Sequence, residues 1–187
     1  NRISQAVNSA ETVVVRGNLH PMARAQYDQG RVDSAFKLER VTLTFQPTAA
    51  QQTDLDDLLT QQQNPSSPNF HKWLTPEDFA DRFGVSRSDM DKTVSWLQAH
   101  GFDVVETARS RNWVAFNGTA AQVEAALHTE IHNYAAKGRR FYANSSEPAV
   151  PAALSGLVLG FEALNDFPLK PRAIRSSSAN SSVQPNF

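Results

Sequence analysis

The stretch Asn69–Gly84 reads NFHKWLTPEDFADRFG, and no other stretch of the chain specifies a helix so completely. Thr75 is expected to be the helix N-cap, and Pro76 then occupies the first helical position, where its missing N–H costs nothing. Asp78 stands three residues after the cap, so its carboxylate can reach back to the Thr75 N–H in a capping box. A helix is therefore predicted to begin at this cap.

The same stretch predicts how this helix packs and ends. Leu74 and Phe79 have the spacing of a hydrophobic staple across the cap. Phe79 and Phe83 share one face at an i, i+4 spacing, and Gly84 is expected to end the helix in a left-handed conformation. These residues describe local structure and predict no chemistry by themselves.

Composition limits the classes of protein that need to be considered. The chain has 187 residues, no cysteine and a formal net charge of −1. A chain of this length can bury a substantial core, so one domain with tails is expected. The absence of a basic run argues against nucleic acid as a partner. No apolar run approaches the roughly 18 residues that span a bilayer, so no membrane association is expected.

Hydrophobic spacing predicts a mixed order of strands and helices. Residues 36–46 alternate as a strand with one buried face, and Leu55, Leu58, Leu59 and Gln62 are expected on the inner side of the next helix. The predicted elements, in order, are a strand at 36–46, helices at 48–63, 75–84 and 86–101, strands at 102–107 and 113–117, a helix from 119, and short strands from 131 to 164. This order indicates a ferredoxin-like split βαβ sandwich of the α+β class: an antiparallel sheet with helices on one face, a helical insertion and extended tails.

Three parts of the chain are distinguished. Residues 1–35 are predicted to be an N-terminal arm, extended and with one strand, and residues 36–165 to be the folded domain. From Asn165 onward the chain changes character, and residues 166–187 are predicted to be a flexible linker. The prolines and the serine-rich composition of this end provide too little apolar surface to order it.

Residues capable of catalysis do not form a recognisable site. The sequence contains no G-x-S-x-G nucleophile motif and no glycine-rich phosphate loop. His128 and His132 have an i, i+4 spacing, but a predicted change from helix to strand separates them, so ordinary histidines are expected rather than a metal pair. Trp73 lies outside any helical stripe, which leaves core packing and surface contact both open. From the residues alone, a non-enzymatic α+β domain is predicted.

Asn69–Gly84 closely resembles the Y-x-K/H-W/Y-L-T-P-E-E/D-F-x-x-x-F-G signature of the pro-kumamolisin type activation prodomain of sedolisin-family serine-carboxyl peptidases. The resemblance extends over roughly residues 13 to 172. It includes further motifs in the same order, namely Gly17–Pro21, Trp96–Phe102, Phe116–Leu127, Tyr142–Asn144, Pro148–Pro151 and Leu157–Phe161.

The resemblance implies a propeptide that inhibits a secreted, acid-active serine-carboxyl endopeptidase, assists its folding, and leaves by autoproteolysis at low pH. The implied partner is the chain's own mature peptidase domain, and a bacterial source is expected. The family's Ser-Glu-Asp triad and its calcium site belong to that mature domain. This chain is therefore expected to carry no catalytic or metal-binding residue and to be no enzyme by itself.

Two groups of residues are candidates for contact with the peptidase. His71 and Trp73 are not needed by the predicted helix, so they are candidate contact residues. The residues expected to occupy the cleft or to be cleaved are Phe167, Pro168, Leu169, Lys170, Pro171 and Arg172. Acid is expected to weaken docking by protonating Asp, Glu or neutral His at the interface. Two alternatives remain: a free-standing protease inhibitor or chaperone, and an unrelated ferredoxin-like module that binds a small ligand.

Overall fold

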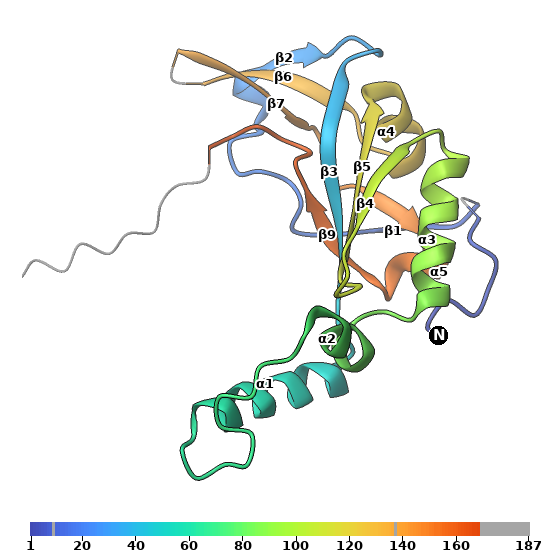
Figure 1. Cartoon of the computed structure of the whole chain (residues 1–187). Coiled ribbons are helices and arrows are strands. Elements are labelled where there is room, and N and C mark those ends of the chain that lie inside the picture. Colours follow the sequence, from blue (N-terminus) through green and yellow to red (C-terminus); the bar gives the residue numbers. More distant parts are fainter. Residues whose placement is uncertain (9, 137, 169–187) are drawn as a thin grey trace, which may run out of the picture.

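The structure is a computed structural model that describes residues 1–8, 10–136 and 138–168 (Figure 1). Its centre is a four-stranded antiparallel sheet with the order β4-β5-β3-β9. These strands are β3 (Lys37–Phe45), β4 (Asp103–Thr107), β5 (Trp113–Thr119) and β9 (Val158–Glu162). In this order β3 and β4 run parallel with β5 between them, which is the split βαβ arrangement. The predicted ferredoxin-like α+β fold is confirmed.

The remaining elements lie before, between and after these strands. The helices are α1 (Ala49–Gln63), α2 (Pro76–Phe83), α3 (Arg87–Ala99), α4 (Ala120–Leu127), α5 (Ala152–Ser155) and the 3-10 helix η1 (Ala25–Tyr27). The other strands are β1 (Thr12–Val14), β2 (Asp28–Arg31), β6 (Ile131–Ala136), β7 (Arg139–Asn144) and β8 (Ala149–Pro151). They form a three-stranded sheet, β2-β6-β7, and a two-stranded sheet, β1-β8. In the part of the chain that the structure describes, no helix is long and apolar enough to cross a membrane.

Strand β3 shows how the hydrophobic pattern becomes a buried face. Leu38, Val41 and Leu43 are fully buried, although the first two are three positions apart. A strict alternation would place them on opposite faces. The register with β5 shifts between Leu38 and Val41, and Arg40 has a positive φ of 51°. This bulge adds the residue that returns Val41 to the inner face.

Helices α3 and α4 cover one face of the four-stranded sheet (Figure 1). Leu97 of α3 and Val123 and Leu127 of α4 are fully buried in the same cluster as Phe116 of β5. Helices α1 and α2 instead project beyond one end of the sheet, as a helical insertion of residues 49–84. No helix of the described chain lies across the other face of the sheet.

The N-terminal arm contributes more to the fold than its sequence predicts. Its β1 pairs with β8, and its β2 pairs with β6. Ile3 is 1% exposed, and its N–H and that of Arg2 donate to the buried Asp89 carboxylate of α3 at 2.9 and 2.8 Å. Residues 1–35 are therefore part of the core as well as an arm.

Two predictions about burial differ from the structure. Of the residues predicted on the inner side of α1, Leu58 and Gln62 are buried as expected, whereas Leu59 is 46% exposed. In the insertion α1 packs against α2 and, at Gln62, against the loop that joins the two helices, so only a narrow stripe of α1 is covered. The predicted linker also begins too early, since Phe167 is 8% exposed and Asn165 pairs with Ala143 of β7. The aromatic ring of Phe167 supplies apolar surface that the composition of the tail as a whole lacks.

Candidate docking surface

The helical insertion starts from a well-satisfied cap. The Asp78 N–H donates to the Thr75 hydroxyl oxygen at 3.1 Å, and the Thr75 N–H donates to the Asp78 carboxylate at 3.3 Å. Pro76 is the first helical residue, and the Phe79 and Phe83 rings lie 5.1 Å apart between centroids. The capping box, the helix and the aromatic pair predicted from the sequence are confirmed.

The predicted left-handed stop at Gly84 is wrong. Gly84 has φ −74° and ψ 169°, an extended conformation that any residue can adopt. A glycine is needed at this position because there is no room for a side chain. A Cβ there would lie 2.5 Å from the Ser110 carbonyl oxygen and 2.8 Å from that of Ala80. The end of α2 thus rests directly on the backbone of the β4–β5 loop.

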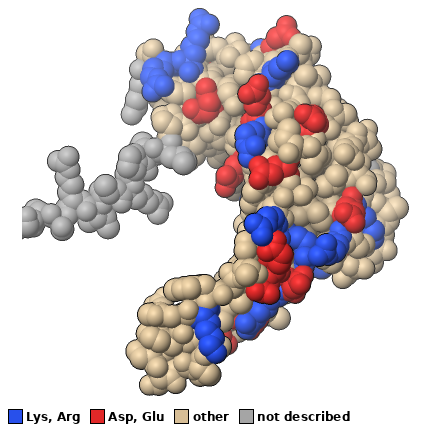
Figure 2. All heavy atoms as spheres, viewed as in Figure 1, with Lys and Arg blue, Asp and Glu red and all other residues tan. Residues whose placement is uncertain are grey.

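Two arginines of the β4–β5 loop fasten α2 to the sheet. Arg109 forms a bidentate ion pair with Glu77 at 2.7 and 3.0 Å, and its hydrogen bond holds the pKa of Glu77 below the ordinary value. Arg111 donates to the carbonyl oxygens of Ala80 and Val85 at 2.7 and 2.8 Å. Figure 2 shows charges of both signs along this junction, whereas the outer end of the insertion is mostly uncharged. The insertion is therefore held at a defined angle to the sheet.

At the outer end of the insertion, three aromatic rings form what we call the aromatic tip: Phe70, His71 and Trp73. The Phe70 and His71 rings stack at 3.7 Å between centroids, and the His71 and Trp73 rings lie at 6.2 Å and 15°. Trp73 is 73% exposed, the largest value among the exposed large apolar side chains of the described residues. The surface alternative for Trp73 is the one that the structure supports.

Gln62 of α1 holds the backbone of the aromatic tip. The Gln62 backbone carbonyl oxygen accepts the His71 N–H at 3.1 Å, and the Gln62 side-chain amide donates to the Lys72 carbonyl oxygen. Gln62 is 4% exposed, and His71 has a positive φ of 54°. Gln62 thus binds this loop through both its backbone carbonyl and its buried side-chain amide, and satisfied buried polar contacts of this kind rigidify their surroundings. The exposed indole is thus displayed by an ordered loop, as a preorganised contact residue needs to be.

The uncovered face of the four-stranded sheet is the second exposed feature. Cross-strand pairs on it join Thr42 to Ala115 and Thr44 to Trp113, and on the other side Thr42 to Glu162 and Thr44 to Gly160. Ala115 is fully buried and pairs in turn with Glu106, which Arg40 binds at 2.8 Å. The face therefore combines small central residues with charged residues at its sides.

The chain leaves the described fold at a third feature, which we call the exit cluster. Phe167 stacks on His20 at 4.3 Å and on Phe141 at 4.6 Å between centroids, and lies 6.2 Å from the Tyr134 ring. Of the predicted cleft or cleavage residues, Phe167 is therefore packed and Pro168 is exposed. Leu169, Lys170, Pro171 and Arg172 lie outside the described residues.

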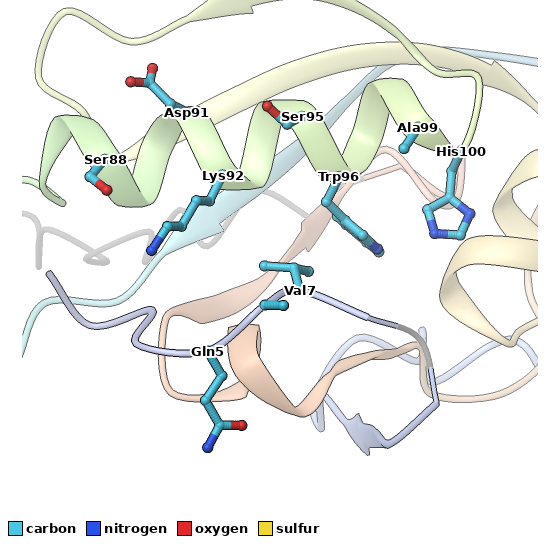
Figure 3. A pocket seen from close by; sticks show the side chains of 10 residues that line it. Gln5, Val7, Ser88, Asp91, Lys92, Ser95, Trp96, Ala99 and His100 are labelled. Carbon is cyan, nitrogen blue, oxygen red and sulfur yellow. The ribbon is translucent and has the colours of Figure 1, made fainter.

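Figure 3 shows a groove of about 610 Å³ between residues 5–7 and α3. Trp96 faces Val7 across it, and the Trp96 Nε1 atom has no hydrogen-bond partner within the described residues. Lys92 donates to the Ile3 carbonyl oxygen at 2.7 Å. Together with the contacts of Asp89, these interactions identify the groove as the place where the N-terminal arm packs on α3.

The two histidines with helical spacing do not come together. His128 is exposed and ends α4 with φ 53°, whereas His132 lies in β6. The His132 ring contacts two carboxylates instead, those of Asp28 and Glu130. Among the residues that the structure describes, no group of three or more His, Cys, Asp or Glu side chains is arranged to hold a metal ion.

The exit cluster, the contacts of Asp89 and the carboxylates around His132 were not predicted from the sequence. Each of these joins segments far apart in the chain, and no local spacing indicates such a contact. The aromatic Phe167, at the start of a tail rich in serine and proline, was the available signal for the exit cluster.

Comparisons with known proteins agree with this geometry. The family model described as "Pro-kumamolisin, activation domain" matches residues 25–167. Xanthomonalisin from Xanthomonas sp. is 37% identical over 118 residues, which are 63% of this chain and 14% of that protein. Sedolisin from Pseudomonas sp. is 29% identical over 52% of this chain and 17% of its own length. Aorsin from Aspergillus oryzae is 26% identical over 67% of this chain and 19% of its own length. The matched region is thus less than a fifth of each of these relatives.

Proposed function

Because the chain belongs to the pro-kumamolisin activation domain family, we propose that it inhibits a secreted, acid-active serine-carboxyl endopeptidase, assists the folding of that enzyme, and is released by autoproteolysis at low pH. The observation that carries this proposal is the family match over residues 25–167, which include the four-stranded sheet and the helical insertion. The proposed partner is the chain's own mature peptidase domain. The catalytic triad and a calcium ion are expected in that domain rather than in this one.

Docking is proposed to use the uncovered sheet face and the aromatic tip together. The sheet face offers small central residues flanked by the carboxylates of Glu106 and Glu162, and Trp73 has the size and exposure of an interface anchor. His71 stacks beside Trp73 and is proposed as the second contact. The insertion is fixed to the sheet by Arg109 and Arg111, so both surfaces meet the partner in one orientation.

The tail is proposed to continue from the exit cluster into the substrate cleft as an added strand. Phe167 is packed in the free domain, so it serves in this proposal as the anchor from which the tail departs. The proposed cleft-occupying and cleaved residues are then Pro168, Leu169, Lys170, Pro171 and Arg172. Secretion of the precursor is part of the proposal, since acid activation separates synthesis from activity.

A refolding and inhibition experiment tests the proposal. The peptidase domain encoded with this chain is denatured and refolded with and without the separately produced residues 1–187. The expected result is a large gain in recovered activity after the domain is removed by acid, together with inhibition of the native peptidase at neutral pH. Equal recovery in both arms would remove the folding role, and full activity in the presence of excess domain would remove the inhibitory role.

A further inference from the structure

Five charged side chains gather where β2 of the N-terminal arm meets β6 and α4. We call this group the His132 cluster, and its members are Asp28, Arg31, Glu124, Glu130 and His132. Nδ1 of His132 lies 2.8 Å from Asp28 Oδ2, and Nε2 lies 2.9 Å from Glu130 Oε2. A carboxylate only accepts hydrogen bonds, so both ring nitrogens have to carry a proton. The geometry is that of an imidazolium held between two carboxylates.

The cluster reinforces a weak part of the fold. Strand β2 pairs with β6 at Asp28–Tyr134 and Arg31–His132, with an irregular register between these pairs, and the Val32 N–H directly after β2 donates to the Ile131 carbonyl oxygen at 2.9 Å. Arg31 adds ion pairs to Glu124 of α4 and to Glu130. A ladder this short provides little stability alone, so the half-buried contacts of His132 with Asp28 add to the attachment that the burial of Val32, directly after β2, provides.

This attachment lies beside the exit cluster. The Tyr134 ring is 6.5 Å from the His132 ring on one side and 6.2 Å from the Phe167 ring on the other. Tyr27, directly before β2, is also packed against the exit cluster. Loss of β2 would therefore uncover the packing surface of Phe167.

We propose that the His132 cluster is an acid-tolerant attachment that keeps β2, and with it the Phe167 anchor, in place at mildly acidic pH. Together with the proposed function, on which this consequence rests, it means that acid separates the domain from its peptidase while the domain stays folded. Cleavage then falls in the tail beyond Phe167 and not within the domain.

The protonation equilibria give the direction of the pH dependence. Burial acts to lower the pKa of His132, but the Glu130 and Asp28 carboxylates outweigh it and the pKa is raised. Burial acts to raise the pKa of Asp28, but the Gly30 N–H and the His132 ring outweigh it and the pKa is lowered. The His132 hydrogen bond and then the charges of Arg31 and His132 likewise lower the pKa of Glu130.

The sign follows for each group. Because the pKa of His132 is higher in the folded chain, its protonated ring contributes its full stability at pH values below the unfolded-state pKa of about 6.5. This stability is lost as the pH rises through the folded-state pKa. Because the pKa values of Asp28 and Glu130 are lower in the folded chain, their carboxylates contribute their full stability at pH values above the unfolded-state pKa of about 4. This stability is lost only as the pH falls through the lower folded-state pKa values. The cluster is therefore complete from about pH 4 to pH 6.5 and weakens above neutrality.

Thermal unfolding of residues 1–187 between pH 4 and pH 9 tests this proposal without any peptidase. His132→Gln removes the charge, and His128→Asn is the control, because it changes an exposed histidine nearby and asparagine tolerates the left-handed backbone there. The melting temperature of the His132 variant is expected to fall by about 2–4 °C at pH 5 and by much less at pH 9. A loss that is equal at both pH values, or larger at pH 9, would overturn the proposal.

Two further measurements keep the proposal testable if His132→Gln does not fold. Asp28→Asn preserves the turn to Gly30 and is expected to show the same pH profile. Digestion by pepsin at pH 4 is expected to cut the wild-type chain only beyond Phe167, and the variants also before it. Equal cleavage of wild type and variants within the domain would contradict the role of the cluster. Inhibition of the peptidase is measured separately, so failure here leaves the proposed function standing.

Discussion

Replacement of Trp73 by alanine separates docking from folding most clearly. Trp73 is 73% exposed, so only about a quarter of a side chain of roughly 200–250 Å², or about 60 Å², is buried in the free domain. At about 25 cal/mol per Å², truncation costs the fold at most about 1.5 kcal/mol. For a domain of this size that is a fall in melting temperature of about 3–6 °C at most.

Docking would bury much of the remaining surface, roughly 150–180 Å², which corresponds to about 4 kcal/mol. Interface anchors of this type lose about 2–4 kcal/mol when truncated, so the inhibition constant should rise between about 30-fold and 1,000-fold. The assay is inhibition of the peptidase by the separately produced domain at neutral pH, with the melting temperature of the free variant measured in parallel.

Leu59→Ala is the matched control, because Leu59 is 46% exposed on the same insertion and outside the aromatic tip. It is expected to leave the inhibition constant within about threefold of wild type, since exposed substitutions away from an interface have small effects. A Trp73 variant that inhibits as well as wild type but melts far lower would contradict the proposed contact with the peptidase, because that result assigns Trp73 to the core.

Three further predictions concern stability. Gly84→Ala should destabilise the fold by about 1–3 kcal/mol in a urea titration, because its Cβ meets backbone oxygen at 2.5 Å, and an unchanged midpoint would contradict that contact. Thr75→Ala should cost about 1 kcal/mol in the same assay by removing the cap, whereas Thr75→Ser should keep most of it. Asp89→Asn should lower stability at pH 6, and its difference from wild type should shrink below about pH 4. Burial acts to raise the pKa of Asp89, but the hydrogen bonds from the Arg2 and Ile3 N–H groups outweigh it, so the pKa is lowered and the charged form stabilises the fold above about pH 4. A difference independent of pH would contradict this reading of Asp89.

Helix caps, turn residues and hydrophobic spacing made much of the fold predictable. The caps at Thr48, Thr75, Ser86 and Thr119 all accept the expected backbone N–H. The β4–β5 hairpin and the succession of strands and helices along the chain also follow from spacing that is local to each element. Such features depend on residues a few positions apart, and the sequence displays them directly.

Contacts between distant segments were not predictable in the same way. Gly84 suggested a left-handed stop, because that is the common use of a glycine at a helix end, while the Ser110 carbonyl that excludes a side chain is invisible in the sequence. Asp89 shows only its position in the first turn of α3, yet its carboxylate holds the N-terminal arm. Phe167 was assigned to a linker by the composition of its neighbours, although its own ring decides where the packing ends.

Within the candidate site, too, individual residues were predictable from the sequence, whereas their contacts were not. Trp73 and His71 stood out because the helix does not require them, and the structure places both at an exposed tip. Gln62 stands in a run of three glutamines, and nothing in that run indicates that its side chain binds the Lys72 carbonyl oxygen beneath the tip. The family resemblance supplied the partner, which no spacing of residues contains.

Acid release of the domain is tested by its affinity for the peptidase domain at pH 7 and at pH 4. Calorimetric titration at both pH values, with circular dichroism of the free domain as a control for folding, gives the ratio of the two dissociation constants. We expect tight binding at pH 7 and binding at least tenfold weaker at pH 4, with the free domain folded at both. Equal affinity at the two pH values, or weaker binding only where the domain has unfolded, would contradict acid release.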